Sequence, residues 1–596
     1  MRVTANRLWA PACALTLPLC VLAIWPVLEL GICDEWSIFK TVQILDHTGR
    51  IVYNGWEAAM LGWQLYLGVA FAKLFGFSFT AVRLSILPVA MATALVTHRV
   101  LVRCGINEWN ATLGTAALVL SPLFLPLAAT FMTDVPALFC LVLCLYACLR
   151  ALQANTDNSA IAWICFAAVA NAIGGTVRQI AWLGVLVMVP STLWLLRRRR
   201  HILMIGGLVY LVSVAFIYGA LHWFSRQPYS VPEHLIQGEV SLGALIHGMW
   251  TLLLVVPELA ALLLPVLLFF IPGVPFGNRR AVTVLASCGV LVAAYLFLVA
   301  HRDLDWRAPY FETGSYIHSH GITPPDTPYG LQPVLLNDMT RIVVTCLAAF
   351  ATVCFVTVVL FRTVELPGVD SRRHSRVSWR QLAVVLAPFA LTYYALLLPR
   401  ATFANLYDRY VLSLLFVALI VILRCYEEKV QPRLPAAAFL TIALYAAFGV
   451  VGTHDAFARH RAFLVAINEL RGAGIPPTEI DGGWEYNGWN QIEFSRYIND
   501  PKITALPGDR FRPSVAKRFG ICRPALIDEF SVIWPRYALA MSPADCLGEA
   551  GFPPVRYHTW LSPQWNTLYI VKVGRPGTHR PLDGFTPIAR SIDDRQ

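Results

Sequence analysis

The sequence predicts an all-α polytopic membrane protein with a small α/β domain at its C-terminal end. Of its 596 residues, 57% are hydrophobic and only 14% are charged, which is far more apolar than a soluble chain of this length requires. Runs of about 18 to 22 apolar residues recur along most of the chain, and each is long enough to cross about 30 Å of hydrocarbon as a helix. Arginines gather in alternate connections between these runs.

The first apolar run, residues 9–32, follows Arg2 and Arg7 and resembles a signal peptide, but it is too long for a typical cleaved one. We expect it to be retained as an anchor. With it, the sequence predicts about thirteen spans. They are residues 9–32, 80–102, 110–127, 135–152, 159–174, 179–196, 202–222, 246–271, 281–300, 341–361, 381–398, 409–425 and 434–452.

The distribution of basic residues predicts the orientation of these spans. Connections rich in arginine stay on the inner side of a membrane, and the run Arg197 to Arg200 is the strongest example. This bias accounts for the formal charge of +11, so a nucleic-acid partner is not needed. With the N-terminus inside and an odd number of spans, residues 453–596 lie outside. We expect a bacterial inner membrane, with this segment in the periplasm.

The sequence divides into a membrane domain, residues 1–452, and an outer domain, residues 453–596. The outer domain begins with helical periodicity and ends with the strand-like "LYIVKVG" at 568–574. Residues 33–79 form a long first outer loop, whose amphipathic "WQLYLGVAFAKLFG" suits the membrane interface. Cys522 and Cys546 lie in the outer domain, where an oxidising compartment would permit a disulfide, although the sequence does not decide whether they pair.

Charged and polar residues recur at the outer ends of the predicted spans, where charge is costly. Each one alone is explained as a capping or snorkelling residue. Together, acids and arginines on one membrane face suggest a site for an anionic, lipid-borne group. The set comprises Asp34, Glu35, Arg83, Asp134, Arg178, Gln179, Asp408 and Arg409.

Five segments in order carry a family resemblance. They are "DEW", the stretch from "GRIVYNGW" to "FTAVRL", "TDVPALF", "VRQIAWL" and "YDRYVLSLL". Over about the first 430 residues they resemble GT-C glycosyltransferases of the protein O-mannosyltransferase type (glycosyltransferase family 39-like), which include bacterial aminoarabinose transferases. The resemblance implies a polyprenyl-phosphate sugar donor, inversion, and an acidic catalytic residue in the first outer loop. The chain has nothing resembling MIR modules, so transfer to protein is not implied, and the acceptor stays open among glycan, lipid and protein.

The chemistry of such a transfer suggests a role for each candidate. A departing phosphate is already a stable anion, so it needs nearby positive charge more than a general acid. By analogy with the family we assign Asp34 as the base for the acceptor hydroxyl. Glu35 would orient the acceptor or hold a divalent ion; whether a metal takes part is left open. Arg178 and Arg409 are the candidates for gripping the donor phosphate.

Further residues are candidates for substrate binding. Arg83, Asp134 and Gln179 share the outer depth of the catalytic candidates. The tetrapeptide "YNGW" occurs at 53–56 and again at 486–489, so Tyr53 and Trp56 could hold a sugar ring by stacking, although turn formation at Asn-Gly also explains the motif. The identity of the sugar, hexose or pentose, is not determined.

The competing function is a polytopic transporter of a lipid-linked or small anionic substrate. Transporters usually carry repeated halves and bind near mid-membrane. This chain shows no such repeat, and its polar residues gather at one face. A non-catalytic lipid-binding protein would explain the basic charge but not the adjacent acids Asp34 and Glu35.

Overall fold

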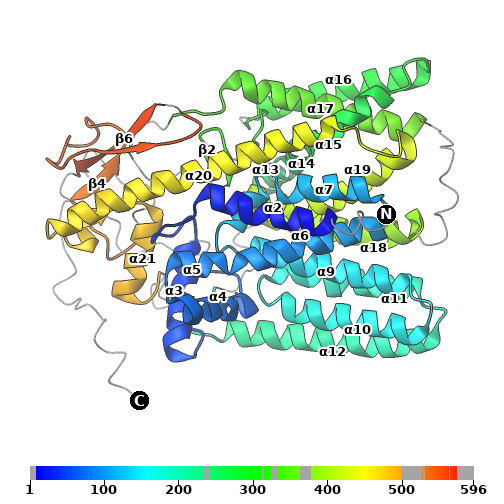
Figure 1. Ribbon diagram of the computed structural model, residues 1–596, viewed down its shortest axis with the longest axis horizontal. Helices are drawn as coiled ribbons and strands as arrows, with labels where there is room; N and C mark the ends of the chain where they lie inside the picture. The colour runs from blue at the N-terminus through cyan, green and yellow to red at the C-terminus, as the bar shows by residue number, and fades with distance from the viewer. Residues whose placement is uncertain are drawn as a thin grey trace.

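The computed structural model describes residues 9–231, 241–302, 304–311, 315–323, 329–330, 333–362, 377–403, 405–498, 527, 530–562 and 564–573. The long helices run side by side along the longest axis, and a small sheet with strands β4 and β6 lies at one end (Figure 1). This arrangement confirms the predicted class, a helical multi-pass membrane protein with a small C-terminal domain that contains a sheet.

Nine helices in the described part of the chain are long and apolar enough to cross a membrane. They are Phe79–Arg103 (α5, Phe79–Leu84, and α6, Ile86–Arg103), α9 (Asp134–Leu152), α12 (Arg200–Ser225), Leu242–Leu262 (α13, Leu242–Leu253, and α14, Val255–Leu262), α16 (Arg279–His301), α17 (Asp338–Phe361), α18 (Trp379–Phe403), Asp408–Lys429 (η6, Asp408–Val411, and α19, Leu412–Lys429) and α20 (Ala437–Gly472).

The remaining predicted spans are shorter or broken helices. They are α2 (Trp9–Ile24), α7 (Glu108–Val119) with α8 (Phe124–Ala128), α10 (Asp157–Gly174), and η2 (Gln179–Trp182) with η3 (Gly184–Met188) and α11 (Val189–Leu195). The predicted span 246–271 also continues past Leu262 into α15 (Leu264–Leu267) and η4 (Leu268–Gly273). Prolines explain two of the differences from the predicted bounds. The first span ends at Ile24 rather than at residue 32 because Trp25, which precedes Pro26, takes a φ of 55°. The second break, after Val119, comes just before Pro122.

Helix α20 joins the membrane bundle to the C-terminal domain. Its 36 residues are about 54 Å long at 1.5 Å per residue, which exceeds about 30 Å of hydrocarbon. The predicted boundary between residues 452 and 453 lies inside this helix. Its last part packs Phe463 and Ile467 against Leu539 and Ile570 of the sheet. One continuous helix therefore carries the C-terminal domain.

The C-terminal sheet has the strand order β3-β4-β6-β5, with β3 and β4 parallel and the other pairs antiparallel. Its strands are β3 (Ile480–Asp481), β4 (Tyr537–Ala540), β5 (Val555–His558) and β6 (Trp565–Lys572), and the short helices η7 (Pro477–Glu479) and α21 (Trp484–Ser495) accompany them. The hairpin of β1 (Ile317–His318) and β2 (Gly321–Ile322) precedes α17. Cys522, one of the two outer cysteines considered above, lies outside the described residues.

The first outer loop contains two helices, α3 (Glu35–Thr48) and α4 (Gly62–Phe75). Helix α3 packs against α4 on one side and against α21 of the C-terminal domain on the other. The backbone N–H of Cys33, just before α3, donates to Oε1 of Glu485 in α21 at 3.1 Å. The end of the bundle that holds α3 therefore also holds the C-terminal domain (Figure 1).

A buried ion pair fixes the start of α3. Nη2 of Arg83, in α5, lies 2.8 Å from Oε2 of Glu35, and the two side chains are 1% and 0% exposed. The same carboxylate accepts hydrogen bonds from the backbone N–H groups of Ile32 and Phe131. Arg83 also donates to the carbonyl oxygens of Leu28 and Leu30. The pair thus joins the end of the first span to α3, α5 and the segment before α9.

These contacts do not fit the roles predicted for the two residues. Both oxygens of Glu35 are occupied by protein donors, which leaves neither for an acceptor hydroxyl or a divalent ion. Arg83 is 1% exposed, and its guanidinium donates to Glu35 and to backbone carbonyl groups. Adjacent acids point in different directions, so burying Glu35 turns Asp34 away from this pair. We therefore assign Glu35 and Arg83 a structural role.

Removing either partner of this pair should destabilise the protein. Arg83→Ala leaves a buried carboxylate without its cation, and Glu35→Gln removes the charge that neutralises Arg83; such losses typically cost about 3–5 kcal/mol. We expect both variants to melt at lower temperature in detergent than the wild type, whereas the exposed-site control Arg50→Ala melts normally. Normal melting of Arg83→Ala would contradict the structural role.

Candidate functional site

Asp34 lies at the N-terminal end of α3, at the membrane end that holds the C-terminal domain. Its carboxylate accepts a hydrogen bond from Nε1 of Trp56 at 3.0 Å and one from Nη2 of Arg409 at 3.4 Å. The side chain of Asp34 is 22% exposed, in contrast to the fully buried Glu35. The structure therefore brings together three predicted site residues from distant parts of the sequence.

A second pair of opposite charges consists of Asp134 and Arg178. Asp134 is the first residue of α9, and Arg178 directly precedes η2. Nη1 of Arg178 donates to Oδ1 of Asp134. The carboxylate of Asp134 is only 4% exposed, and its Oδ2 is buried without a hydrogen-bond partner. Such a buried acceptor is costly unless a ligand or water reaches it.

Two tyrosines connect the Asp34 and Asp134 pairs. The guanidinium of Arg409 lies 4.9 Å from the ring centre of Tyr407 and 5.8 Å from that of Tyr410. The guanidinium of Arg178 lies 5.0 Å from the Tyr410 ring, on which both pairs therefore converge. Cation–π contacts of this kind hold a guanidinium in place while its N–H groups stay available.

Arg400, near the C-terminal end of α18, adds a third guanidinium that the sequence analysis did not single out. It lies 5.7 Å from the ring centre of Tyr410 and 5.9 Å from that of Tyr407. We call Asp34, Asp134, Arg178, Arg400 and Arg409 the charged cluster. Among these five residues, three cations and two aspartates therefore lie around the same two tyrosine rings.

Glu57 is a further member of the site that the sequence analysis missed. Its Oε1 is buried without a hydrogen-bond partner. Burial raises the pKa of Glu57 to about 8; the charges of Asp34 and Asp134 also raise it, and those of Arg409 and Arg178 oppose the rise. At neutral pH this carboxyl therefore holds its proton and can donate a hydrogen bond. Its position directly after the "YNGW" motif was the available clue.

Gln179 and Trp56 connect the site to neighbouring segments of the chain. Nε2 of Gln179 donates to the carbonyl oxygen of Ala58 at 2.9 Å, which ties the Arg178 segment to the loop that carries Glu57. The ring of Trp56 lies 4.9 Å from that of Trp484 in α21 and 5.6 Å from that of Trp36. The C-terminal domain thus contributes an aromatic side chain beside Asp34.

Tyr53 does not fit its predicted role in sugar binding. The side chain is 2% exposed, and its hydroxyl donates to the carbonyl oxygen of Met60 at 2.8 Å. Its ring packs 5.0 Å from that of Phe224. Tyr53 is therefore a packing residue of the first outer loop. The second "YNGW" lies in α21, where Tyr486 and Asn487 are also buried.

No group of three or more His, Cys, Asp or Glu side chains that could hold a metal ion occurs among the described residues. Because Glu35 is engaged by Arg83, the predicted divalent ion has no support from that residue. The requirement for a metal stays open.

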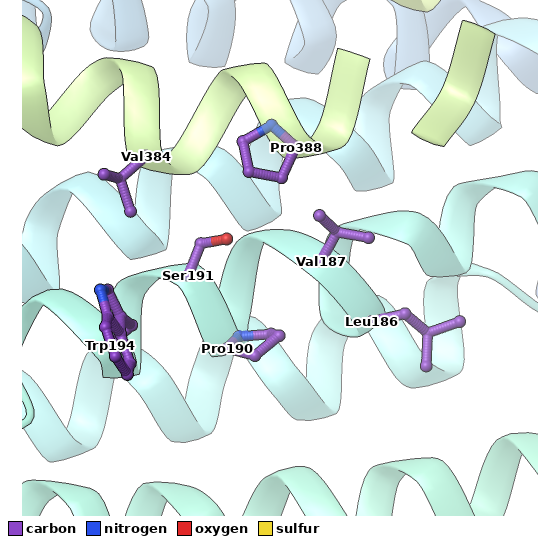
Figure 2. A pocket seen from close by; sticks show the side chains of 7 residues that line it. All are labelled: Leu186, Val187, Pro190, Ser191, Trp194, Val384 and Pro388. Carbon is purple, nitrogen blue, oxygen red and sulfur yellow. The ribbon is translucent and has the colours of Figure 1, made fainter. Parts of the chain in front are cut away.

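An apolar groove lies between α18 and the segment formed by η3 and α11, and none of its lining residues belongs to the charged cluster. Figure 2 shows the side chains that line it: Leu186, Val187, Pro190, Ser191, Trp194, Val384 and Pro388. Its volume is about 390 Å³, and none of these side chains is charged. The groove suits a hydrocarbon chain rather than a polar substrate.

Comparison with known proteins finds no matching family model and no curated relative. Among solved structures, the chain is similar to ArnT from Cupriavidus metallidurans, at 16% identity over 85% of this chain and 84% of that one, with a TM-score of 0.36 in the apo state. The undecaprenyl-phosphate complex of ArnT matches at 14% identity over 76% and 80% of the two chains, also with a TM-score of 0.36.

A third match is the Pmt1-Pmt2 protein O-mannosyltransferase complex of S. cerevisiae bound to its sugar donor, with 14% identity and a TM-score of 0.30. It covers 37% of this chain and 33% of the other, so the match spans only about a third of that protein's length. The matches therefore include a protein O-mannosyltransferase, the type of protein that the sequence motifs resemble. Likeness at these TM-scores carries no argument about function, which must come from the site.

The pKa of Glu57 predicts a distinctive pH dependence of stability. The pKa of Glu57 is raised to about 8 in the folded protein, so the folded state binds this proton more tightly than the unfolded state does. The resulting contribution to the free energy of unfolding is fully present below the ordinary glutamate pKa. It is lost as pH rises from there to about 8. Glu57→Gln mimics the protonated form. We expect its melting temperature to match that of the wild type near pH 5 and to exceed it increasingly towards pH 9.

Thermal melting of both proteins in detergent between pH 5 and pH 9 measures this difference. The control Glu549→Gln, at an exposed position, should follow the wild type at every pH. Equal melting of Glu57→Gln and the wild type at pH 9 would show that Glu57 is not held in its protonated form.

Proposed function

We propose that the protein is a membrane glycosyltransferase that moves a sugar from a polyprenyl-phosphate donor to an acceptor hydroxyl, with inversion at the anomeric carbon. The observation that supports this most is the charged cluster, in which two Asp–Arg pairs and a third arginine converge on Tyr407 and Tyr410. The family resemblance of the sequence motifs points to the same reaction.

The arginines supply what the departing phosphate requires. When the bond between the anomeric carbon and the phosphate oxygen breaks, the electron pair stays on the phosphate, which gains negative charge. Guanidinium groups already held in place stabilise that charge without reorganising. Arg178 and Arg409 bind the phosphate, because both are oriented by an aspartate and a tyrosine ring. Arg400 adds positive charge beside them.

Asp34 acts as the base. The acceptor oxygen forms its bond to the anomeric carbon on the face opposite the phosphate, and its proton passes to the Asp34 carboxylate. Of the two adjacent acids, only Asp34 is accessible, since Glu35 is fully buried. Trp56 holds one oxygen of Asp34 in position through its indole N–H. Asp134 and the protonated Glu57 line the same site and orient the sugar hydroxyls.

The lipid part of the donor would lie along the apolar groove of Figure 2. Leu186, in the wall of the groove, follows Arg178 by eight residues along η2 and η3. The site faces the outer, periplasmic side of an inner membrane. The arginine-rich turn at Arg197 to Arg200 supports this orientation, because all four residues are exposed and such turns stay inside.

Incubating the purified protein with radiolabelled undecaprenyl-phosphate sugar tests the proposal. We expect the label to leave the lipid, either by transfer to added glycan, lipid or protein acceptors or by slow hydrolysis. In vesicles, movement of the intact labelled lipid across the bilayer without loss of its sugar would instead indicate a transporter and contradict the proposal.

Asp34→Asn should fold and bind donor but lose transfer. Asparagine keeps the shape and can still accept the Trp56 hydrogen bond, but it cannot take the acceptor proton; loss of a general base typically costs about 10² to 10⁴ in rate. Initial rates of transfer, measured at saturating donor, report this loss. The control Asp46→Asn changes a carboxylate on the same helix that pairs with Lys73 instead, and should keep wild-type rates. Normal turnover in Asp34→Asn would remove Asp34 from the mechanism.

Arg178→Ala should weaken donor affinity and slow transfer together, because the phosphate gains charge as the sugar departs. Arg178→Lys should recover only part of both, since an ammonium group lacks the bidentate grip of a guanidinium. Donor affinity and melting temperature are measured on the same purified variants. If Arg178 is only a structural partner of Asp134, both variants would have a lower melting temperature. Their folded fraction would still bind donor and transfer sugar normally, which would contradict the phosphate role.

A further inference from the structure

A second polar pocket lies outside the charged cluster, where three parts of the chain meet. Its walls come from α20, from the segment after the β1–β2 hairpin, and from the region of β5 and β6. Arg459 and Asp455 of α20 face Tyr557, Thr559 and Asn566 of the C-terminal domain across it. Neither the predicted site residues nor the proposed reaction uses these side chains.

Arg459 is the unusual member of this pocket. The side chain is only 9% exposed, and Nη2 donates to the carbonyl oxygen of Thr323. Its Nε is buried without a hydrogen-bond partner. An arginine cannot shed its proton, so a buried guanidinium is costly unless an acceptor or an opposite charge meets it. Within the described part of the chain, Arg459 forms no ion pair.

Asp455, one helical turn before Arg459, is already engaged elsewhere. Its carboxylate accepts hydrogen bonds from Nδ1 of His454 at 3.0 Å and from the backbone N–H groups of Trp560 and Leu561 at 2.7 and 2.8 Å. These three donors occupy both oxygens of the carboxylate and hold it towards the Trp560 segment. The pocket wall therefore offers a guanidinium donor that the aspartate does not satisfy, which favours an anionic ligand.

The size of the pocket limits that anion. Its volume is about 30 Å³, and a single water needs roughly 10–15 Å³ on this measure. There is room for two or three oxygen-sized atoms, as in a carboxylate, but not for a sugar ring or a complete phosphate group. The hydroxyls of Tyr557 and Thr559 and the amide of Asn566 surround this space with further hydrogen-bonding groups.

We infer that this pocket binds a carboxylate, either of a small free acid or at the end of a larger molecule, with Arg459 as its principal contact. Bound there, the carboxylate would connect α20, the Thr323 segment and the sheet of the C-terminal domain. The inference is independent of the proposed sugar transfer, because it uses none of the residues of the charged cluster.

Thermal melting of the full-length protein in detergent tests the inference with sodium acetate, glucuronate, phosphate and chloride at one ionic strength. Acetate should raise the melting temperature of the wild type with the logarithm of its concentration, by on the order of 2–4 °C at about 100 times its dissociation constant. If glucuronate and acetate raise the melting temperature equally, the ligand is a carboxylate on a larger molecule. If only acetate raises it, the ligand is a small free acid. Both results support the inference. A larger effect of phosphate or chloride, or no effect of either carboxylate, would overturn it.

Variants assign the effect to the pocket. Arg459→Gln should abolish the acetate shift, Arg459→Lys should retain part of it, and Arg471→Gln, an exposed arginine on the same helix, should retain all of it. If Arg459→Gln does not fold, Ser562→Phe is the alternative, because it keeps the arginine and fills the pocket with a larger side chain. This variant should also abolish the acetate shift. An unchanged acetate shift in the folded pocket variants would reject the site.

Discussion

The buried ion pair between Glu35 and Arg83 is the constraint on which the site depends. It joins the end of the first span, the start of α3, helix α5 and the segment before α9 in a single set of hydrogen bonds. Separating the two partners would leave each as a buried, uncompensated charge, so the start of α3 has little freedom to move. Asp34 is the residue directly before Glu35, and its carboxylate is held outside the pair, towards Trp56 and Arg409.

The cost of burying a polar group without a hydrogen-bond partner also distinguishes the charged cluster from the Glu35–Arg83 pair. In the Glu35–Arg83 pair every oxygen is satisfied by the protein. In the cluster, the fit is incomplete: Asp134 Oδ2, Arg409 Nε and Glu57 Oε1 are buried without hydrogen-bond partners. Groups of this kind are costly in a folded protein and concentrate where a ligand completes them. The contrast separates the structural pair from the candidate site.

The sequence predicted the fold class and named several residues of the candidate site, for identifiable reasons. Hydropathy located the long apolar helices of the described residues, because the bilayer demands long apolar runs, and depth along the spans picked out Asp34, Asp134, Arg178 and Arg409. Depth does not reveal which side of a helix a residue faces, so Glu35 and Arg83 were assigned to the substrate although they face each other. Glu57 and Arg400 were missed because each reaches the cluster only through tertiary contacts. The predicted boundary at 452 lies inside α20, because hydropathy falls there while the helix itself continues.

A cryo-EM structure of the protein with undecaprenyl phosphate tests the central claim most directly. The account predicts density for the phosphate within about 3 Å of the guanidinium groups of Arg178 and Arg409, with the Asp34 carboxylate facing the space that the sugar would occupy. Phosphate density distant from both arginines, with the Asp34–Arg409 and Asp134–Arg178 pairs unchanged, would contradict it.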